Sequence, residues 1–464
     1  WGCGMTMAVA NNIAGTTPIK EDVFGQLADA IARTLTSQGL SVSTHFTLTV
    51  SGEHSQFTRF NRARVRQTGQ VDDGSLTLTV MQSDRTASGT VPFIGEFDTD
   101  WPLLKTTLAE LQTLVPQLPV DPFVVLPTGS ATSRTVNQGE LLTADAIATT
   151  LLSPVHTLDF TGIYAGGLIF RGYADSAGQR HWFESTSYSL DFSLFDAQNR
   201  AVKGTVAGNQ WQQPHFLDKI NQAKHQLVMM ARPAKTIDRG QYRTYLAPAA
   251  VAELLHMFSW GGVGEADLQQ GNSAFGLLRQ GKRQLSPKFT LQENFDQANT
   301  PRFNTYGEVA PLQLPIILKG QLVNSLVSSR SAKEYKTPSN YASRREHLRA
   351  PEILTGTVAS DQVLARLERG LYLSNLHYLN WSDHPNGRVT GMTRYACFWV
   401  ENGEIVAPIE NLRFDESLYH CFGEGLVDLT DFQETVPTID TYDRRGLGDS
   451  RVPGILANDF TYTL

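Results

Sequence analysis

Two short stretches in the first third of the chain alternate strictly between apolar and threonine side chains. Residues 46–50 read Phe-Thr-Leu-Thr-Val, and residues 76–80 read Leu-Thr-Leu-Thr-Val. A period of two places the apolar side chains of each stretch on one face, which is typical of a half-buried strand. Asp73-Gly74, just before the second stretch, predicts a tight turn between strands. These patterns constrain the fold most, because they require a sheet with one covered face and one polar face.

Helical patterns flank these strands. Apolar side chains spaced by three and four residues predict helices over residues 18–38 and 101–115. The first third is therefore expected to be mixed α and β. The proline-rich segment 116–129 predicts a linker or a subdomain joint.

The middle of the chain predicts hairpins between two further helices. Helices are expected near residues 143–152 and 216–231, and antiparallel strands over residues 168–206. The turns between these strands are predicted at 175–178 and 196–199. The glycines here fit no phosphate-binding pattern, so turn chemistry explains them.

Strand and turn signals dominate from residue 312 onward. Residues 383–387 (Asp-His-Pro-Asn-Gly) predict a hairpin, and residues 395–400 predict a buried strand. The expected fold class is α+β and two-lobed, with an N-terminal mixed α/β lobe and a C-terminal lobe rich in antiparallel β-sheet. Three units are predicted: an α+β subdomain (1–115), a hairpin-rich subdomain (116–231) and a β-rich domain (232–464).

The charge pattern argues against direct binding of nucleic acid. The 464 residues carry a net charge of −7, with lysine and arginine dispersed along the chain. The basic run 344–349 and the pair Arg444-Arg445 are short, and acids interrupt them. We expect a solvated helix face rather than a phosphate-binding patch.

Cysteine use and hydropathy predict a cytoplasmic protein. Cys3, Cys397 and Cys421 have no CxxC spacing and are too few for a disulfide framework, which favours a reducing compartment. Cys397 lies in an apolar stretch and is expected to be an inert buried thiol. No apolar run approaches the roughly 20 residues of a membrane helix, and the start of the chain does not resemble a signal peptide. A chain that begins at Trp1 suggests that a few native residues are missing.

Residues 256–261 read His-Met-Phe-Ser-Trp-Gly at the end of a predicted helix that starts near Pro248. A single histidine on an apolar helix is more often a packed core residue than a metal ligand, so His256 is expected to pack. Glycines at 261, 262 and 264 end the helix. Glu265 and Asp267, the nearest acids, are expected to be polar turn residues rather than ligands.

Several segments in this order resemble the TldD/PmbA family, described as peptidases and as gyrase modulators. The resemblance is carried by Thr58-Arg59-Phe60-Asn61 through Gln67, the helix with His256, residues 269–275 and 285–287, Gly370-Leu371-Tyr372-Leu373, and residues 401–409. In TldD-type members the helix carries His-Glu-x-x-x-His. PmbA-type (TldE) members lack that motif.

The resemblance implies a zinc centre in the intact members. Their two histidines bind zinc, the glutamate is the general base, and a cysteine from the C-terminal domain is the third ligand. In this chain His256 matches the first histidine, Met257 occupies the position of the general base, and Gly261 occupies the position of the second histidine. The cysteine position falls near Asn375-Leu376-His377. No cofactor is therefore expected, with His256 as a residual metal candidate.

The resemblance thus implies a PmbA-like member of a peptide- or protein-processing system, inactive alone and working with a catalytic partner. The partners it implies are a second copy or a TldD-like subunit, and a peptide or unfolded protein as substrate. His377, Tyr378 and Trp381 are candidates for lining a peptide cleft. Two alternatives stay open: an active hydrolase rebuilt around His256, His377 and an acid, or a non-catalytic peptide-binding or scaffold protein.

Overall fold

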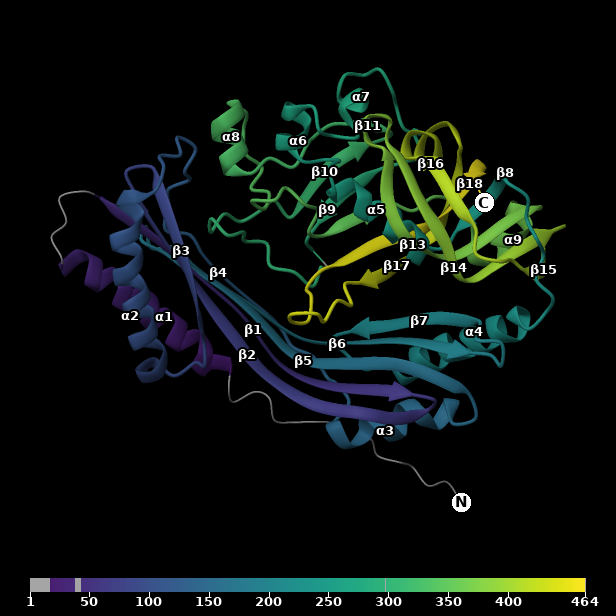
Figure 1. Ribbon diagram of the computed structural model, residues 1–464, viewed down its shortest axis with the longest axis horizontal. Coiled ribbons are helices and arrows are strands. Elements are labelled where there is room, and N and C mark those ends of the chain that lie inside the picture. Colours follow the sequence, from purple (N-terminus) through teal and green to yellow (C-terminus); the bar gives the residue numbers. More distant parts are fainter. Residues whose placement is uncertain (1–16, 38–42, 297, 464) are drawn as a thin grey trace.

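A computed structural model describes residues 17–37, 43–296 and 298–463. The chain forms two lobes, each built on one large sheet (Figure 1). Helices and extensive antiparallel sheets occur together, so the predicted α+β class is confirmed. None of the helices in the described ranges is long and apolar enough to cross a bilayer.

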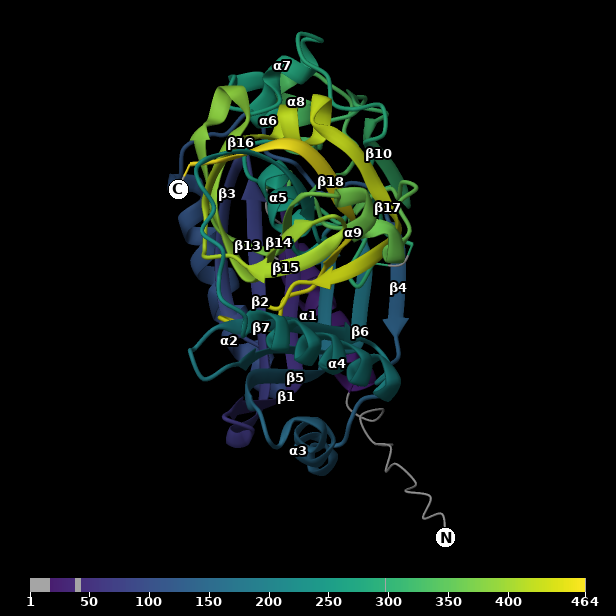
Figure 2. The ribbon, with the colours of Figure 1, turned by 90° about the vertical axis from the view of Figure 1, so that its right-hand side faces the viewer.

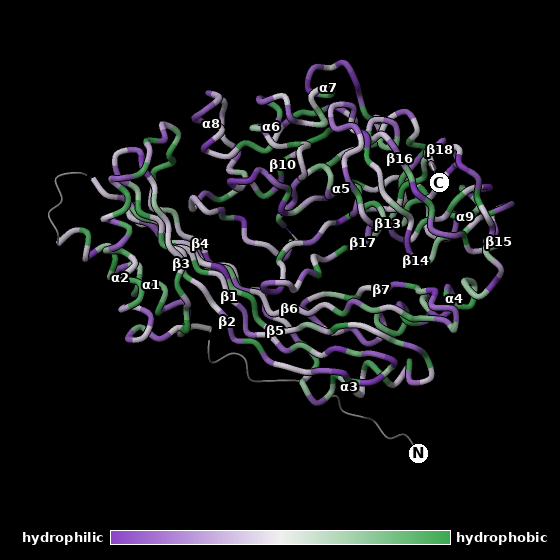
Figure 3. Tube along the Cα trace, in the orientation of Figure 1, coloured by the Kyte–Doolittle hydropathy of each residue, from purple (hydrophilic) through white to green (hydrophobic). Residues whose placement is uncertain are grey.

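A seven-stranded sheet forms the N-terminal lobe. Its order is β3-β2-β1-β5-β6-β4, with β7 also paired to β6. The strands are β1 (Thr44–Asn61), β2 (Arg64–Gln82), β3 (Arg85–Pro92), β4 (Thr132–Asn137), β5 (Asp159–Asp175), β6 (Arg180–Phe195) and β7 (Ala201–Gly208). Polar and apolar residues alternate along the long strands (Figure 3), as the threonine patterns predict. Strands from both sides of residue 115 share this one sheet.

Four helices cover this sheet. They are α1 (Thr17–Ser37), α2 (Phe97–Leu114), α3 (Ala144–Leu152) and α4 (Gln213–Met230). Helices α1 and α2 share one apolar core with the ends of β1 and β2, and α3 and α4 share another with β5, β6 and β7. All four helices lie where the apolar spacing predicts them.

The predicted turn at Asp73-Gly74 is wrong. Both residues lie inside β2, where Gly74 pairs with Gly52 and Asp73 with Glu53. A Cβ at Gly74 would lie 2.7 Å from the Phe93 carbonyl oxygen, so glycine permits a close backbone approach. The hairpin between β1 and β2 instead turns at Arg62 and Ala63, both with a φ of 50°.

An eleven-stranded sheet forms the C-terminal lobe. Its order is β11-β10-β9-β12-β18-β16-β14-β13-β8, and β18 also pairs with β8, which closes a ring of five strands. β15 and β17 pair with β14 and β18. The strands are β8 (Gly240–Leu246), β9 (Leu291–Asn294), β10 (Gln313–Leu318), β11 (Gln321–Leu322), β12 (Pro351–Ile353), β13 (Gly370–Asp383), β14 (Arg388–Glu401), β15 (Glu404–Pro408), β16 (Arg413–Ser417), β17 (Leu426–Pro437) and β18 (Asp449–Tyr462).

Helix α5 (Pro248–Ser259) lies inside the curved strands of this lobe (Figure 2). Pro248 occupies its first turn, where a missing N–H costs nothing. Val251, Leu254, Leu255 and Phe258 join the core made by β13, β14, β16 and β18. The smaller helices are α6 (Glu265–Gln270), α7 (Gly276–Arg279), α8 (Ser329–Tyr335) and α9 (Val363–Leu367). The predicted hairpin at 383–387 is confirmed, because a single 3-10 turn there joins β13 to β14.

The basic segments are not solvated helix faces, contrary to expectation. Residues 344–349 form neither helix nor strand. The Arg349 guanidinium donates to the carbonyl oxygens of residues 301–303 and lies 4.9 Å from the ring of Phe295. Arg445 is 5% exposed and binds the opposite lobe. Both arginines stabilise irregular chain segments that offer few backbone hydrogen bonds of their own.

Candidate functional site

His256 lies on the solvent side of helix α5. The residues on either side of it, Leu255 and Met257, are each 1% exposed, whereas the His256 side chain is exposed. The prediction that His256 packs into the core is therefore wrong. The apolar stripe of α5 is fully used by its neighbours, which leaves position 256 on the opposite face.

A cleft of about 400 Å³ opens at His256. One wall is the last two turns of α5, and the other walls are segments far away in the sequence, around residues 300, 348–351, 436–438 and 447–450. The Ser259 hydroxyl accepts a hydrogen bond of 3.0 Å from the Leu348 N–H, which holds one of these segments against the helix. The polar residues that line the cleft are Glu253, His256, Ser259, Thr300, Arg349, Thr438, Asp449 and Ser450.

Two carboxyl groups in this cleft have raised pKa values. Burial raises the pKa of Glu253 above its ordinary value, and the charges of His256 and Lys203 oppose that shift. Solvent still reaches the Glu253 side chain, so its surroundings are crowded rather than sealed. Burial also raises the pKa of Asp449, against the charge of Arg451 and a backbone hydrogen bond from Asn299. Perturbed carboxyls that share a cleft are typical of binding and catalytic sites.

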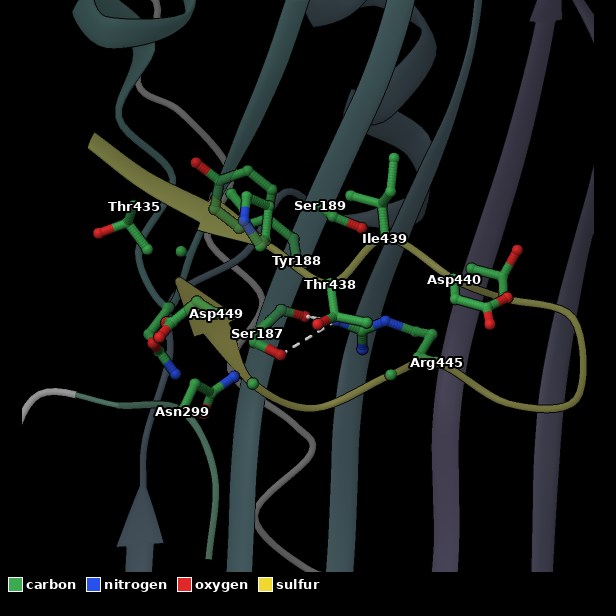
Figure 4. Close-up of a pocket in the computed structure, with 17 residues that line it drawn as sticks. Ser187, Tyr188, Ser189, Asn299, Thr435, Thr438, Ile439, Asp440, Arg445 and Asp449 are labelled. Carbon is green, nitrogen blue, oxygen red and sulfur yellow. Dashed lines mark hydrogen bonds between the residues drawn. The ribbon is translucent and has the colours of Figure 1, made fainter. Parts of the chain in front are cut away.

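A second, smaller pocket of about 80 Å³ lies between β6 and β7 and the segment that joins β17 to β18. It shares Pro437, Thr438, Gly448 and Asp449 with the cleft, so this segment separates the two spaces. Arg445 crosses from the segment into the N-terminal sheet, where its guanidinium donates to the Ser187 hydroxyl and carbonyl oxygens at 3.0 and 2.8 Å (Figure 4). The smaller pocket therefore lies at the joint between the two lobes, and the cleft lies on the C-terminal side of this segment.

The residues present do not fit a zinc ion. Met257 is 1% exposed and points into the core, away from His256. Gly261 has a φ of +72°, and a Cβ there would lie 2.7 Å from the His384 Nε2 atom, so a histidine could not stand at 261 without displacing His384. No group of three or more His, Cys, Asp or Glu residues in the described ranges could hold a metal ion. His256 alone leaves a zinc ion short of the three protein ligands that a catalytic site uses.

His377 and Tyr378 lie on β13 with exposed side chains whose rings are 4.1 Å apart. They are not among the described residues that line the His256 cleft. Trp381 donates from its indole N–H to the Trp260 carbonyl oxygen at 2.9 Å, and His384 hydrogen bonds to the carbonyl of Gly261 at 2.8 Å. These two residues satisfy carbonyl groups just past the end of α5. A substrate-binding role for His377, Tyr378 and Trp381 stays a prediction.

Glu265, Cys397 and Cys421 are buried and contribute to the packing of the fold. The sequence predicts Glu265 in a polar turn, but it begins helix α6 and is 2% exposed. Its carboxylate accepts hydrogen bonds from the Arg279 guanidinium at 2.9 and 3.0 Å. Cys397 and Cys421 are buried free thiols, and burial raises the pKa of Cys397 to about 11. Cys397 is therefore a protonated, inert thiol at neutral pH. Cys3 lies outside the described residues.

Sequence reasoning missed Glu253, Arg349 and Asp449. Glu253 stands three residues before His256, a spacing that places two side chains on the same helix face, so this residue could have been found. The other two come from distant segments that carry no local signal.

The sequence of the C-terminal lobe and the fold of the whole chain are similar to those of known proteins. Residues 239–463 match the model of the PmbA/TldA metallopeptidase C-terminal domain. No curated protein matches the sequence. The fold is similar to that of TldE from Thermococcus kodakarensis, with a TM-score of 0.75 and 12% identity over 94% of this chain and 100% of that one.

Two further solved structures have the same fold. A candidate modulator of a DNA gyrase from Thermotoga maritima has a TM-score of 0.75 and 13% identity over 95% of this chain and 100% of its own. A candidate modulator of DNA gyrase from Bacteroides thetaiotaomicron has a TM-score of 0.75 and 16% identity over 95% and 98%. Residues 239–463 thus carry the sequence pattern of the PmbA/TldA metallopeptidase C-terminal domain, as the resemblance to the TldD/PmbA family predicts, and the whole chain has the fold of TldE.

Proposed function

We propose that this chain is the PmbA-like, non-catalytic member of a peptide-processing pair. It binds a peptide or an unfolded segment in the His256 cleft while a TldD-like subunit with an intact zinc motif cuts. The observation that carries this proposal is the end of α5, where Met257 is buried and His384 occupies the space of a side chain at 261. A water nucleophile at neutral pH needs both a metal and a base, and the matched positions supply neither.

The cleft supports a binding role rather than a pure scaffold role. Its space of about 400 Å³ is open, whereas a scaffold would have no need of an unfilled recess at this point. Hydroxyls, an imidazole and two carboxyls line it, so an extended peptide would find partners for its backbone N–H groups. The pairing, as homodimer or heterodimer, and the cytoplasmic location are parts of the same proposal.

Reconstitution tests the division of labour. The purified chain alone should hydrolyse unstructured peptides at the background rate, and activity should appear only when a family member with an intact His-Glu-x-x-x-His motif is added. His256→Ala should leave the pairing intact, because the His256 side chain is exposed on the solvent side of α5. If the isolated chain cleaves peptides, and both chelator and His256→Ala abolish the cleavage, the proposal is wrong and a rebuilt metal site takes its place.

A space-filling substitution tests the cleft directly. His256→Trp should block peptide binding by the full chain, measured by fluorescence anisotropy with a labelled 12-residue peptide. His225→Trp is the matched control, because His225 is an exposed histidine in the middle of helix α4 and lies outside the cleft. Equal peptide affinity in the two variants would show that the peptide does not bind in the His256 cleft.

A further inference from the structure

A third pocket, of about 390 Å³, lies at the far side of the joint between the lobes. The N-terminal lobe contributes the turn between β6 and β7 and the end of α4, and the C-terminal lobe contributes β14 and the end of β15. Its floor is apolar and includes Phe195, Met230, Pro408 and Ile409. It shares no residue with the His256 cleft.

A β-bulge in β14 forms the polar wall of this pocket. Leu373 pairs with Cys397 and Asn375 pairs with Arg394, so Tyr395 and Ala396 together face the single residue Ser374. The Ser374 hydroxyl and the Cys397 thiol both donate to the Arg394 carbonyl oxygen, at 3.3 and 3.2 Å. Bulges of this kind re-aim side chains and occur often next to functional sites.

Tyr395 adopts a strained backbone conformation at the bulge. Its φ is 64°, in the left-handed region that costs a residue with a Cβ roughly 1–2 kcal/mol. Glycine would occupy this position without strain, so the ring of Tyr395 is retained at a cost in stability. Such outliers cluster at ligand sites, where the surrounding structure holds them.

Arg394 is a cation without an ionic partner. Its side chain is exposed into the pocket, and none of the ion pairs in the described part of the chain includes it. Arg200, the other arginine that lines the pocket, is held by Asp196 at 2.7 Å. Glu410 is the only carboxylate that lines the pocket among the described residues, and its side chain is exposed.

The ring of Tyr395 holds the Arg394 guanidinium in position. The Arg394 guanidinium lies 5.3 Å from the ring centre, and the Lys203 ammonium of the opposite lobe lies 5.9 Å from it. Lys203 is itself paired with Asp191 at 3.1 Å. The aromatic face thus holds Arg394 while its N–H donors stay available for a ligand.

We propose that this pocket binds the free C-terminal carboxylate of a peptide, with the terminal side chain on the apolar floor. A guanidinium presents two parallel N–H donors that match the two oxygens of a carboxylate, and none of the ion pairs among the described residues uses those of Arg394. Asn199 and Asn411, which also line the pocket, offer amide groups to the last peptide unit. The inference does not depend on the proposed role of the His256 cleft, because the two spaces are separate.

A pair of short ligands tests the inference with the full chain. The probes are one fluorescein-labelled tripeptide ending in leucine, prepared as the free acid and as the C-terminal amide, and anisotropy measures their affinities. The acid should bind at least roughly tenfold more tightly, since a hydrogen bond to a charged group contributes this much. Arg394→Gln should abolish that preference. Arg66→Gln, which removes an exposed arginine on β2, should retain it.

The outcomes separate this inference from the proposed function. Equal affinity for acid and amide, an acid preference that survives in Arg394→Gln, or no binding of the tripeptide would each overturn the inference. In all three cases the proposed role of the His256 cleft would still hold if the unmodified chain binds the 12-residue peptide and His256→Trp does not. Thermal melting of Arg394→Gln should match that of the unmodified chain, so a loss of preference cannot come from unfolding.

Discussion

Arg445 and Arg394 both lie where the two lobes meet, and they differ in how their charges are satisfied. Arg445 is 5% exposed, and its guanidinium donates to Ser55, to the Gly167 carbonyl and to Ser187. Burial lowers its pKa to about 10, opposed by the Glu53 carboxylate, so the group stays charged at neutral pH. Arg394 is exposed and has no ion pair within the described ranges. The same residue type is thus a structural anchor in one pocket and an available donor in the other.

Neighbouring contacts reinforce the anchor. Arg444 donates to Asp73 at 2.6 Å and to Ser75 at 3.0 Å, so two consecutive arginines tie the segment between β17 and β18 to the N-terminal sheet. This segment also forms one wall of the His256 cleft. The anchor therefore sets the shape of the cleft without lining it.

Arg445→Ala should have the largest effect. It leaves the buried acceptors at Ser55, Gly167 and Ser187 without their donor, and a buried acceptor left unsatisfied costs roughly 1–3 kcal/mol. Urea unfolding followed by tryptophan fluorescence measures the loss. Arg394→Ala is the matched control and should change the free energy of unfolding by less than about 0.5 kcal/mol. Similar losses in the two variants would erase the distinction between anchor and available donor.

Cys397→Ser should have an intermediate effect. The thiol lies in an apolar core, and a hydroxyl there costs about 1–3 kcal/mol even though it can still donate to the Arg394 carbonyl. The melting temperature should fall while the proposed pairing and peptide binding persist. Unchanged melting together with lost function would instead indicate a reactive thiol.

A comparison of two substitutions at Tyr395 isolates the strain at the bulge. Tyr395→Gly should be more stable than Tyr395→Ala by about 1 kcal/mol, because both remove the ring but only alanine keeps the left-handed penalty. Met392, in the same strand without a positive φ, is the control site. There the order should reverse, since glycine weakens an ordinary strand. Urea unfolding measures both pairs. If the alanine variant is more stable than the glycine variant at both sites, Tyr395 is unstrained.

The smallest effect should appear at His377. Desolvation is the largest cause that lowers the pKa of His377, and the charges of Arg394 and Lys203 lower it further. Arg394→Gln removes one positive charge, so the pKa of His377 should rise, by a small amount because an exposed pair is screened by solvent and salt. An NMR titration of the imidazole protons measures it. Arg445→Gln, if it folds, should leave this titration unchanged, and an equal rise in that variant would contradict the placement of Arg394.

Local patterns predicted most of the elements of both lobes. The threonine alternation at 46–50 and 76–80 lies in β1 and β2, and the helical spacings became α1 to α5. The pattern failed at Asp73-Gly74, because a two-residue turn signal is indistinguishable from a glycine that lets another chain segment approach closely. The real turn at Arg62 and Ala63 carries no such signal.

The sequence by itself determined the α+β class and the two-lobed division, because both depend on residue identity and on periods of two or about 3.6. Only the tertiary structure decided that His256 faces a cleft, that His384 fills the space beside Gly261, and that Arg445 is satisfied while Arg394 is not. These facts depend on which of several distant segments meet. Contacts of that kind are fixed by the packing of the whole chain, and no local pattern carries them.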